Sequence, residues 1–287
     1  MIYYVLLCVS IVLAVVKSAF YNKYAKSEKP DFGGILSFNA VCYGAAFVTS
    51  LFFGIKFTFS LPTVICALFY AINVCLLQGL SVYAMKLGPM TASSLISLYG
   101  MIIPTISGPL FWHEPFGIIQ FSGVTLMLIS MFLLSVNEKS NKNIDKKWFP
   151  VIITVFFLSG MAGIIEKIHQ STDGKSEKAQ FLCIAYLIMF VVSLCGRFML
   201  TNKSKEIVSV KRLSLIGIIS GAVIGVYALT NLTLAGKLNS TVYYPVANGG
   251  ALILTVVVSA TVFHERCAKK QFVGIIIGLA SVILLSF

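Results

Sequence analysis

The chain has 287 residues, of which 58% are hydrophobic and 11% are charged, and its mean hydropathy is +0.92. A soluble domain carries about 25% charged residues, so the composition excludes a water-soluble globular protein and predicts an integral membrane protein. The net charge of +12 does not indicate nucleic-acid binding, because no exposed domain with interleaved basic and aromatic residues is evident; we expect these charges in loops beside a lipid bilayer.

Ten apolar runs without charged residues follow one another along the chain. They cover residues 2–16, 33–55, 57–85, 87–112, 115–137, 148–165, 179–196, 213–236, 238–263 and 271–287. Most exceed the ~18 residues that a membrane-spanning helix needs, and only helices satisfy their own backbone within such runs. The runs predict an all-α, multi-pass protein of the cell (plasma or inner) membrane with ten transmembrane helices. We expect Pro104 and Pro109 to kink or break the fourth helix.

The stretch 86–135 recurs 151 residues later in the sequence. The pair His113-Glu114 returns as His264-Glu265, and ten of the 23 positions that begin at His113 are identical at this offset. Shared apolar composition does not produce so many identities, so the chain contains an internal repeat. Each Glu precedes a predicted helix by a few residues, where a carboxylate meets free backbone N–H groups.

A polar linker divides the chain into two halves. The linker covers residues 138–147, the first half 1–137 and the second half 148–287, with five predicted helices in each half. An odd number of helices per repeat inserts the two copies in opposite orientations, which is the inverted-repeat plan of many secondary transporters. Loops after odd-numbered helices carry 16 Lys and Arg residues and loops after even-numbered helices carry five, which puts both termini outside by the positive-inside rule.

The repeated motif resembles a known family. Each half contains a short turn with Glu, then Gln-x-x-Gly and an apolar helix: His113-Glu114…Gln120-Phe121-Ser122-Gly123 and His264-Glu265…Gln271-Phe272-Val273-Gly274. This pattern resembles the EamA-type transporters of the drug/metabolite transporter superfamily over the whole chain. The family more often has Gly before that Glu, and it usually keeps its termini in the cytoplasm, in conflict with the loop charges. The resemblance implies alternating-access transport of a small-molecule substrate.

The repeat suggests a central substrate site. In the ninth predicted helix Ser240, Tyr244 and Asn248 recur at every fourth position, and the offset of 151 maps Tyr244 onto Ser93 and Asn248 onto Ser97. A pseudo-twofold axis brings such pairs toward the centre, where inverted-repeat transporters bind substrate. The alternative is that these side chains form hydrogen bonds between helices and bind no ligand.

Lys17 is the one charged residue inside a predicted spanning helix. A lysine at the membrane centre costs ~2.5–3.5 kcal/mol, so its position needs a cause. One interpretation is that its stem extends to the nearby interface. The other is that it faces the cavity with Ser10 and Tyr21, where it would attract a carboxylate or phosphate and repel a cation.

Further candidates come from polar residues inside the other apolar runs. They are Asn73 and Gln78 in the third predicted helix and Tyr227 and Asn231 in the eighth. Glu166, near the end of the sixth, is either a loop anchor or the acid that carries a coupling proton.

These observations predict a secondary transporter for a small polar metabolite, amino acid-like or organic anion-like. The alternatives are a proton-coupled multidrug or cation exporter and a membrane scaffold or lipid-carrier flippase subunit. Enzymatic activity is not expected, because the spans carry no HExxH or GxSxG. Neither a cofactor nor a metal is expected, since the three histidines have no clustered partners. Gly274 and Gly278 in the tenth predicted helix suggest a homodimer face.

Overall fold

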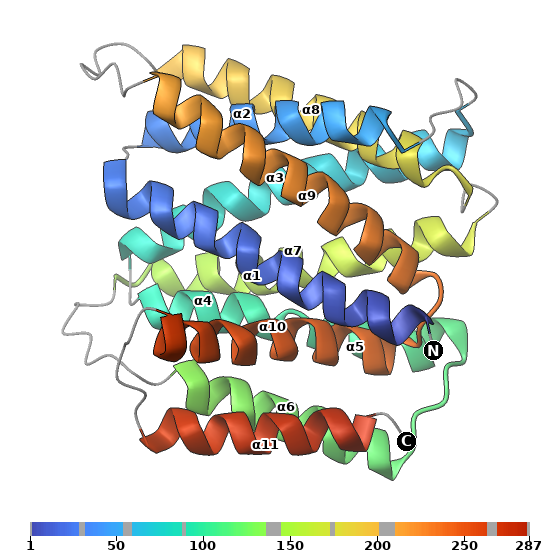
Figure 1. The fold of residues 1–287 in the computed structure, drawn as a ribbon. Helices are drawn as coiled ribbons and strands as arrows, with labels where there is room; N and C mark the ends of the chain where they lie inside the picture. Colours follow the sequence, from blue (N-terminus) through green and yellow to red (C-terminus); the bar gives the residue numbers. More distant parts are fainter. Residues whose placement is uncertain are drawn as a thin grey trace. The chain divides into compact units, whose positions relative to one another are not determined.

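The computed structural model describes residues 2–28, 32–53, 59–87, 90–135, 145–172, 176–200, 210–262 and 269–285. Within these ranges every regular element is a helix (Figure 1): α1 (Ile2–Glu28), α2 (Phe32–Leu51), α3 (Leu61–Leu87), α4 (Met90–Tyr99), α5 (Ile102–Trp112), α6 (Ile118–Ser135), α7 (Trp148–Ser171), α8 (Lys178–Leu200), α9 (Val210–Ala235), α10 (Ser240–Val262) and α11 (Lys269–Leu285). Within the described ranges each predicted apolar run is mostly helical.

Seven helices in the described ranges are long and apolar enough to cross a membrane, namely α1, α2, α3, α7, α8, α9 and α10. The remaining apolar runs form shorter helical stretches at Ile96–Trp112, Ile118–Leu133 and Phe272–Leu285. The protein is therefore a helical membrane protein with several candidate spans, and ten spans stay a prediction.

The fourth predicted helix is broken, as its prolines led us to expect. The break falls at Gly100, between α4 and α5, four residues before Pro104. Pro104 has no N–H for the Gly100 carbonyl, which accepts instead from the Ile103 N–H at 3.0 Å. A Cβ at Gly100 would lie 2.7 Å from the Phe156 carbonyl oxygen of α7, so glycine allows a close approach there. Pro109 lies inside α5 and does not end it.

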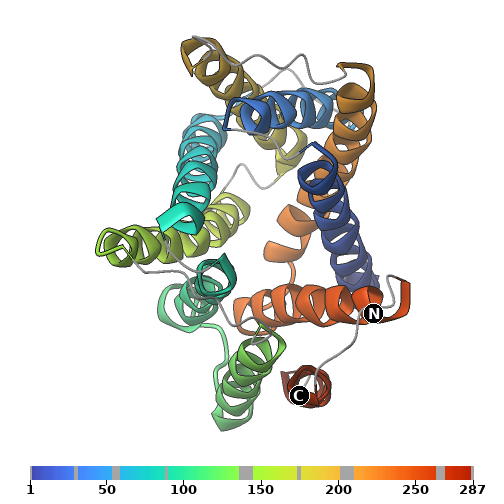
Figure 2. The same ribbon diagram turned by 90° about the vertical axis from the view of Figure 1, so that its left-hand side faces the viewer.

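The chain forms two compact units. Unit 1 contains Met1–Val12, Leu76–Ile164 and Lys237–Phe287, and unit 2 contains Leu13–Cys75 and Ile165–Gly236. Each unit combines segments from both halves of the sequence, and α1, α3 and α7 each contribute to both units (Figure 2). The division at the linker 138–147 stays a prediction.

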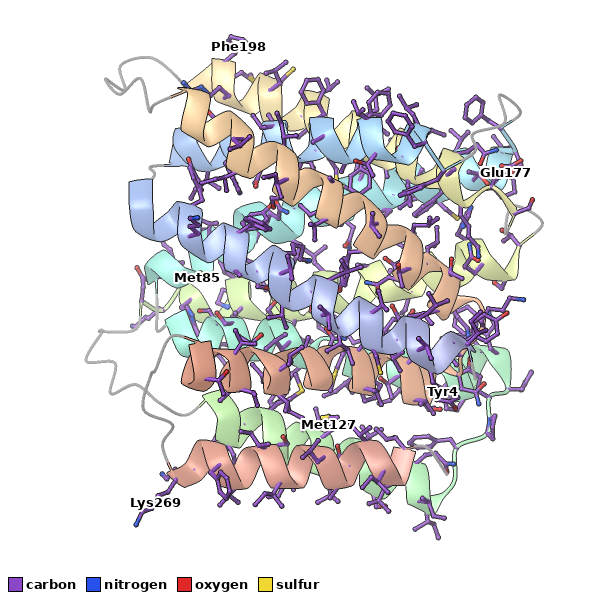
Figure 3. The ribbon with its side chains drawn as sticks, viewed as in Figure 1. Tyr4, Met85, Met127, Glu177, Phe198 and Lys269 are labelled. Carbon is purple, nitrogen blue, oxygen red and sulfur yellow. The ribbon has the colours of Figure 1, made fainter. Side chains whose placement is uncertain are left out.

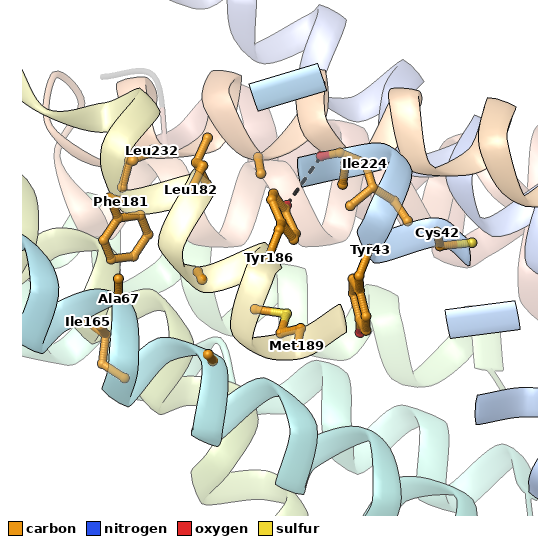
Figure 4. Packing of buried hydrophobic residues seen from close by; sticks show 14 of the residues in the cluster. Cys42, Tyr43, Ala67, Ile165, Phe181, Leu182, Tyr186, Met189, Ile224 and Leu232 are labelled. Atoms are coloured by element: carbon orange, nitrogen blue, oxygen red, sulfur yellow. Dashed lines mark hydrogen bonds between the residues drawn. The ribbon is translucent and has the colours of Figure 1, made fainter. Parts of the chain in front are cut away.

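In unit 2, α2 packs against α8 and α9. The α9 glycines Gly217, Gly221 and Gly225 face α2, and a Cβ at Gly221 would lie 2.6 Å from the Cβ of Ala45. These glycines therefore serve internal helix packing. Beside them a cluster of buried apolar and aromatic side chains, including Phe181 and Leu232, forms the core (Figure 4).

In unit 1, α6 packs along α11, and α10 contacts both (Figures 1 and 2). The Ser130 hydroxyl of α6 donates to the Gly274 carbonyl of α11 at 2.7 Å. A Cβ at Gly278 would lie 2.6 Å from Ser130 Oγ and would collide with Ile253 of α10. The small-residue face of α11 is thus occupied within the chain, so a homodimer through this helix would have to use another of its faces.

Candidate functional site

Lys17 lies in α1, and its Nζ atom sits over the ring of Tyr227 in α9, 4.4 Å from the ring centroid. A cation over an aromatic face is stabilised by about 0.5–2 kcal/mol, which offsets part of the ~2.5–3.5 kcal/mol that a mid-membrane lysine costs. The Glu166 carboxylate of α7 is near enough to act on the Lys17 charge. These contacts fit the interior interpretation of Lys17, and its place relative to the membrane interface stays a prediction.

Glu166 lies within a helix and not at its end. The apolar run predicted to stop at residue 165 continues as α7 to Ser171, so Glu166 is inside the candidate span Trp148–Ser171. The Tyr70 hydroxyl of α3 donates to Glu166 Oε1 at 3.1 Å. An isolated carboxylate in an apolar environment is costly, and the Tyr70 hydrogen bond and the Lys17 charge reduce that cost.

Asn73 lies one helical turn after Tyr70 on the same face of α3. Its side chain is 7% exposed, and its Oδ1 atom has no hydrogen-bond partner among the residues that the structure describes. A buried acceptor without a donor costs about 1–3 kcal/mol. A donor from a bound molecule or water would remove this cost. We refer to Lys17, Tyr70, Asn73, Glu166 and Tyr227 as the charged cluster.

Buried tyrosines of the unit 2 core lie close to this cluster. The Tyr186 hydroxyl donates to the Ile224 carbonyl at 3.5 Å, and the Tyr186 ring stacks on Tyr43 with centroids 6.2 Å apart (Figure 4). Tyr186 is also near enough to Glu166 for its charge to act on the phenol. The charged cluster therefore lies beside the packed aromatic rings of the unit 2 core.

The structure brings together four predicted site residues, Lys17, Asn73, Tyr227 and the coupling candidate Glu166, in unit 2. Asn231 is half-buried one helical turn after Tyr227 on α9. Gln78, although predicted together with Asn73, is half-buried in the part of α3 that belongs to unit 1.

The predicted central residues of unit 1 form hydrogen bonds within the protein, Tyr244 to another helix and Asn248 within its own. The buried Tyr244 hydroxyl of α10 donates to the Gly163 carbonyl of α7 at 2.7 Å, and Asn248 Nδ2 donates to the Tyr244 carbonyl at 2.9 Å. Gly163 lies so close that a Cβ there would be 2.8 Å from the Tyr244 ring.

Their repeat equivalents lie at another helix contact of unit 1. Trp148 Nε1 of α7 donates to Ser93 Oγ at 3.0 Å, and the Ser159 hydroxyl donates to the Ser97 carbonyl at 2.7 Å. The Tyr244 and Ser93 bonds fit the alternative interpretation, in which the polar side chains join helices. Ser97 contributes only its backbone carbonyl here. A substrate-binding role for Ser93, Ser97, Tyr244 and Asn248 stays a prediction.

Sequence reasoning missed a chain of hydrogen bonds at one end of unit 2. The fully buried His169 of α7 contacts Thr63 Oγ1 of α3 through Nε2 at 3.2 Å. Thr63 Oγ1 and Ser60 Oγ are hydrogen-bonded at 2.9 Å, and the Ser60 hydroxyl donates to Glu177 Oε2 at 2.7 Å. We refer to His169, Thr63, Ser60 and Glu177 as the hydroxyl chain. The sequence signal was the position of His169 three residues after Glu166.

Glu177 lies directly before α8, outside the candidate spans (Figure 3). Besides the Ser60 hydroxyl, its Oε2 accepts the Ser60 backbone N–H at 3.0 Å. These hydrogen bonds favour the carboxylate and lower the pKa of Glu177 below its ordinary value of 4.5.

Glu114 of the repeated motif caps a helix, but not the one that follows it. Its Oε2 accepts the Ser240 backbone N–H at 2.6 Å, and the Ser240 hydroxyl donates to Oε1 at 3.3 Å, so it caps α10. His113 ends α5 in the left-handed conformation, with φ of 52°. His264 and Glu265 lie outside the described residues.

Three comparisons place the chain among known proteins. No family model matches it. A Haemophilus influenzae protein, itself described as uncharacterized, is 25% identical over 196 residues, which are 65% of this chain and 63% of that protein. The match thus spans less than two thirds of the relative's length. One solved crystal structure superposes with a TM-score of 0.78 at 10% identity, over 98% of this chain and 95% of the other, and it shows the fold alone.

Proposed function

We propose that the protein is a secondary transporter of the EamA type that moves a small polar metabolite, amino acid-like or organic anion-like, by alternating access. The observation that carries the proposal is the charged cluster. Lys17 and Glu166 both lie in candidate membrane spans, and each has an aromatic partner, Tyr227 or Tyr70. Ionisable residues inside a membrane mark substrate or ion pathways by default.

Contacts between α6 and α11 support the inverted repeat that this function implies. The offset of 151 relates Met127 to Gly278 and Ser130 to Ser281. Ser281 Oγ lies 3.5 Å from Met127 Sδ (Met127 is labelled in Figure 3), and a Cβ at Gly278 would lie 2.6 Å from Ser130 Oγ. The offset turns the Met127–Ser281 contact into the Gly278–Ser130 contact, with α6 and α11 exchanging roles. A twofold relation between two helices generates this pattern.

A proton-coupled exporter is the second candidate, and the Glu166–Tyr70 hydrogen bond favours it. A carboxylate held within a span is the group that a proton-coupled mechanism needs. Lys17 beside it disfavours a cationic cargo, because the two positive charges would repel.

The test is a thermal-unfolding panel on the purified full chain with three probe classes: amino acids, small carboxylates and quaternary ammonium ions. A ligand at 100 times its Kd stabilises the folded state by about 2.7 kcal/mol. We expect zwitterions or anions to stabilise the protein, and Lys17→Met to abolish this effect while Lys237→Met, in an exposed loop position, retains it. Stabilisation by quaternary ammonium ions alone would favour the exporter, and no stabilisation in any class would count against both.

A further inference from the structure

The hydroxyl chain can align its donors in one direction. Gln170 Nε2 lies 2.9 Å from His169 Nδ1, and an amide nitrogen only donates, so Nδ1 accepts in the neutral tautomer that carries its proton on Nε2. Nε2 then donates to Thr63 Oγ1. The Ser60 hydroxyl lies within donating distance of both Thr63 Oγ1 and Glu177 Oε2; when its one proton goes to Glu177, Ser60 Oγ accepts from Thr63. In this arrangement every donor points from the buried imidazole toward the Glu177 carboxylate.

The two ends of the chain lie in different environments. His169 and Thr63 are both fully buried and lie in candidate spans. Ser60 and Glu177 lie just outside the spans that begin at Leu61 and Lys178, and both are partly exposed. The hydrogen bonds therefore run from the interior of unit 2 to its aqueous end.

The buried end lies next to the charged cluster. His169 follows Glu166 by three residues, so the two share one face of α7 and are one helical turn apart. Thr63 and Tyr70, their partners on α3, are seven residues apart and also share a face. The Phe181 ring of α8 contacts His169 with centroids 4.5 Å apart and Tyr70 at 5.3 Å, so Phe181 lies at the junction of the hydroxyl chain and the Tyr70–Glu166 pair.

We propose that His169, Thr63, Ser60 and Glu177 form a proton relay between the interior of unit 2, beside Glu166, and the aqueous end of the unit. The proposal rests on the transport function above, since it gives the coupling proton of Glu166 a route. It also accounts for a fully buried histidine whose two ring nitrogens both have hydrogen-bond partners.

Each transfer conserves one proton. A proton that reaches Nδ1 from the interior makes His169 an imidazolium, and the Gln170 amide turns so that its oxygen accepts from Nδ1–H. The Nε2 proton passes to Thr63, the Thr63 proton to Ser60 and the Ser60 proton to the Glu177 carboxylate, which releases it to water. His169 is left with its proton on Nδ1. Inward transfer uses the same atoms with both hydroxyls turned.

Several charges act on this transfer. Glu177 and Lys178 at the start of α8 act on the His169 charge in opposite senses, and Lys178 Nζ donates to Thr233 Oγ1 of α9 at 3.2 Å. On α7 itself, Glu166 lies three residues and Lys167 two residues before His169. Thr63 and Phe181 contribute no charge from α3 and α8.

The test measures how fast the His169 imidazole N–H exchanges with water. The full chain is labelled with ¹⁵N-histidine in lipid nanodiscs, and His169→Gln assigns the signal. A relay predicts that Thr63→Val, which removes the hydroxyl but keeps the shape, slows exchange at least about tenfold. The matched control is Thr230→Val, because the Thr230 hydroxyl donates within α9 to the Val226 carbonyl at 2.8 Å; it should change the rate by less than about twofold.

Unchanged or faster exchange of the His169 N–H in Thr63→Val would overturn the proposal. If the chain only ties helix ends together, removal of Thr63 loosens this end and leaves exchange unchanged or faster. Should Thr63→Val not fold, Ser60→Ala removes the next hydroxyl outside the spans and carries the same prediction. The measurement needs no substrate, so its result is independent of the thermal-unfolding panel. Slowed exchange in Thr63→Val without stabilisation by any probe would support the relay and reject the transporter. Stabilisation by a probe with unchanged exchange would reject the relay alone.

Discussion

Units 1 and 2 use polar side chains inside apolar helices in two different ways. In unit 1 the Tyr244 and Ser130 hydroxyls end on backbone carbonyls of neighbouring helices, both at 2.7 Å. Unit 2 contains the charges of Lys17 and Glu166 and the Asn73 amide oxygen, which lacks a donor in the described part of the chain. Buried hydroxyls without a hydrogen-bond partner in the described part of the chain occur in both units, Thr241 in unit 1 and Ser220 in unit 2, so the two charges are what distinguish unit 2. Ionisable residues inside spans mark substrate or ion pathways, and the comparison therefore directs the search for substrate to unit 2.

The largest expected effect comes from removing one charge of unit 2. Lys17→Met leaves the Glu166 carboxylate, which lies in a candidate span, without its cationic neighbour, and an uncompensated charge within a span costs about 2.5–3.5 kcal/mol. Thermal unfolding at pH 7 measures the loss. Lys237→Met, at an exposed position of unit 1, should have no effect, and equal effects of the two variants would contradict the comparison.

Adding a Cβ atom at the close contact between α2 and α9 of unit 2 should have the next largest effect. A Cβ at Gly221 would collide with the Cys42 carbonyl of α2, which cannot rotate away, so Gly221→Ala should destabilise the protein by about 2–3 kcal/mol. At Gly79 a Cβ would meet no atom within 4 Å, so Gly79→Ala should stabilise α3 by about 0.5–1 kcal/mol. The two unfolding temperatures should move in opposite directions.

Paired tyrosine substitutions sharpen the comparison further. Tyr244→Phe leaves the Gly163 carbonyl without its hydroxyl donor and should cost about 1–2 kcal/mol, with ligand stabilisation unchanged. Tyr70→Phe removes the donor to Glu166 and should change ligand stabilisation or its pH dependence. Thermal unfolding with and without the active probe separates the effects, and a ligand effect from Tyr244→Phe would return the substrate site to unit 1.

A smaller effect is expected at the end of α5. His113 has φ of 52°, a conformation that costs a residue with a Cβ roughly 1 kcal/mol and glycine nothing. His113→Gly should therefore stabilise unit 1 by up to about 1 kcal/mol in thermal unfolding, while Lys237→Gly provides an exposed comparison without this strain. A destabilised His113→Gly protein would mean that the imidazole itself has a role.

The smallest effect concerns the aqueous end of unit 2. The pKa of Glu177 is lower in the folded protein than its ordinary value of 4.5, because Ser60 donates two hydrogen bonds. Its contribution to stability is therefore complete above pH 4.5 and is lost as the pH falls through the lower folded value. Unfolding temperatures between pH 6 and 3 should fall less steeply in Glu177→Gln than in the wild type, and parallel curves would contradict the assignment.

The sequence predicted the helices well but the functional residues only in part. Apolar runs without charges indicate helices directly, and Lys17 stood out because a charge in such a run needs a partner. Pro104 indicated the break in the fourth predicted helix, because it removes the N–H that the Gly100 carbonyl would accept. The close approach of Phe156 to Gly100 was not readable from the sequence, because Phe156 belongs to a helix more than fifty residues away.

Two kinds of site information were not readable from the sequence. The spacing of Tyr244 and Asn248 indicates a shared helix face but not whether the partner is a ligand or, as at Gly163, a carbonyl. The hydroxyl chain joins Thr63 to His169 across 106 residues and Ser60 to Glu177 across 117, and each of these residues alone resembles an ordinary polar residue near a helix end.

The Glu114 cap on α10 has a consequence for biosynthesis. Glu114 leaves the ribosome 126 residues before Ser240, an interval of roughly 6–25 s at about 5–20 residues per second. Ser130 of α6 is likewise made 144 residues before Gly274 of α11. During these intervals α5 and α6 have been made, while the helices that complete their contacts do not yet exist. Truncation after α9 should therefore leave unit 1 open to membrane quality control.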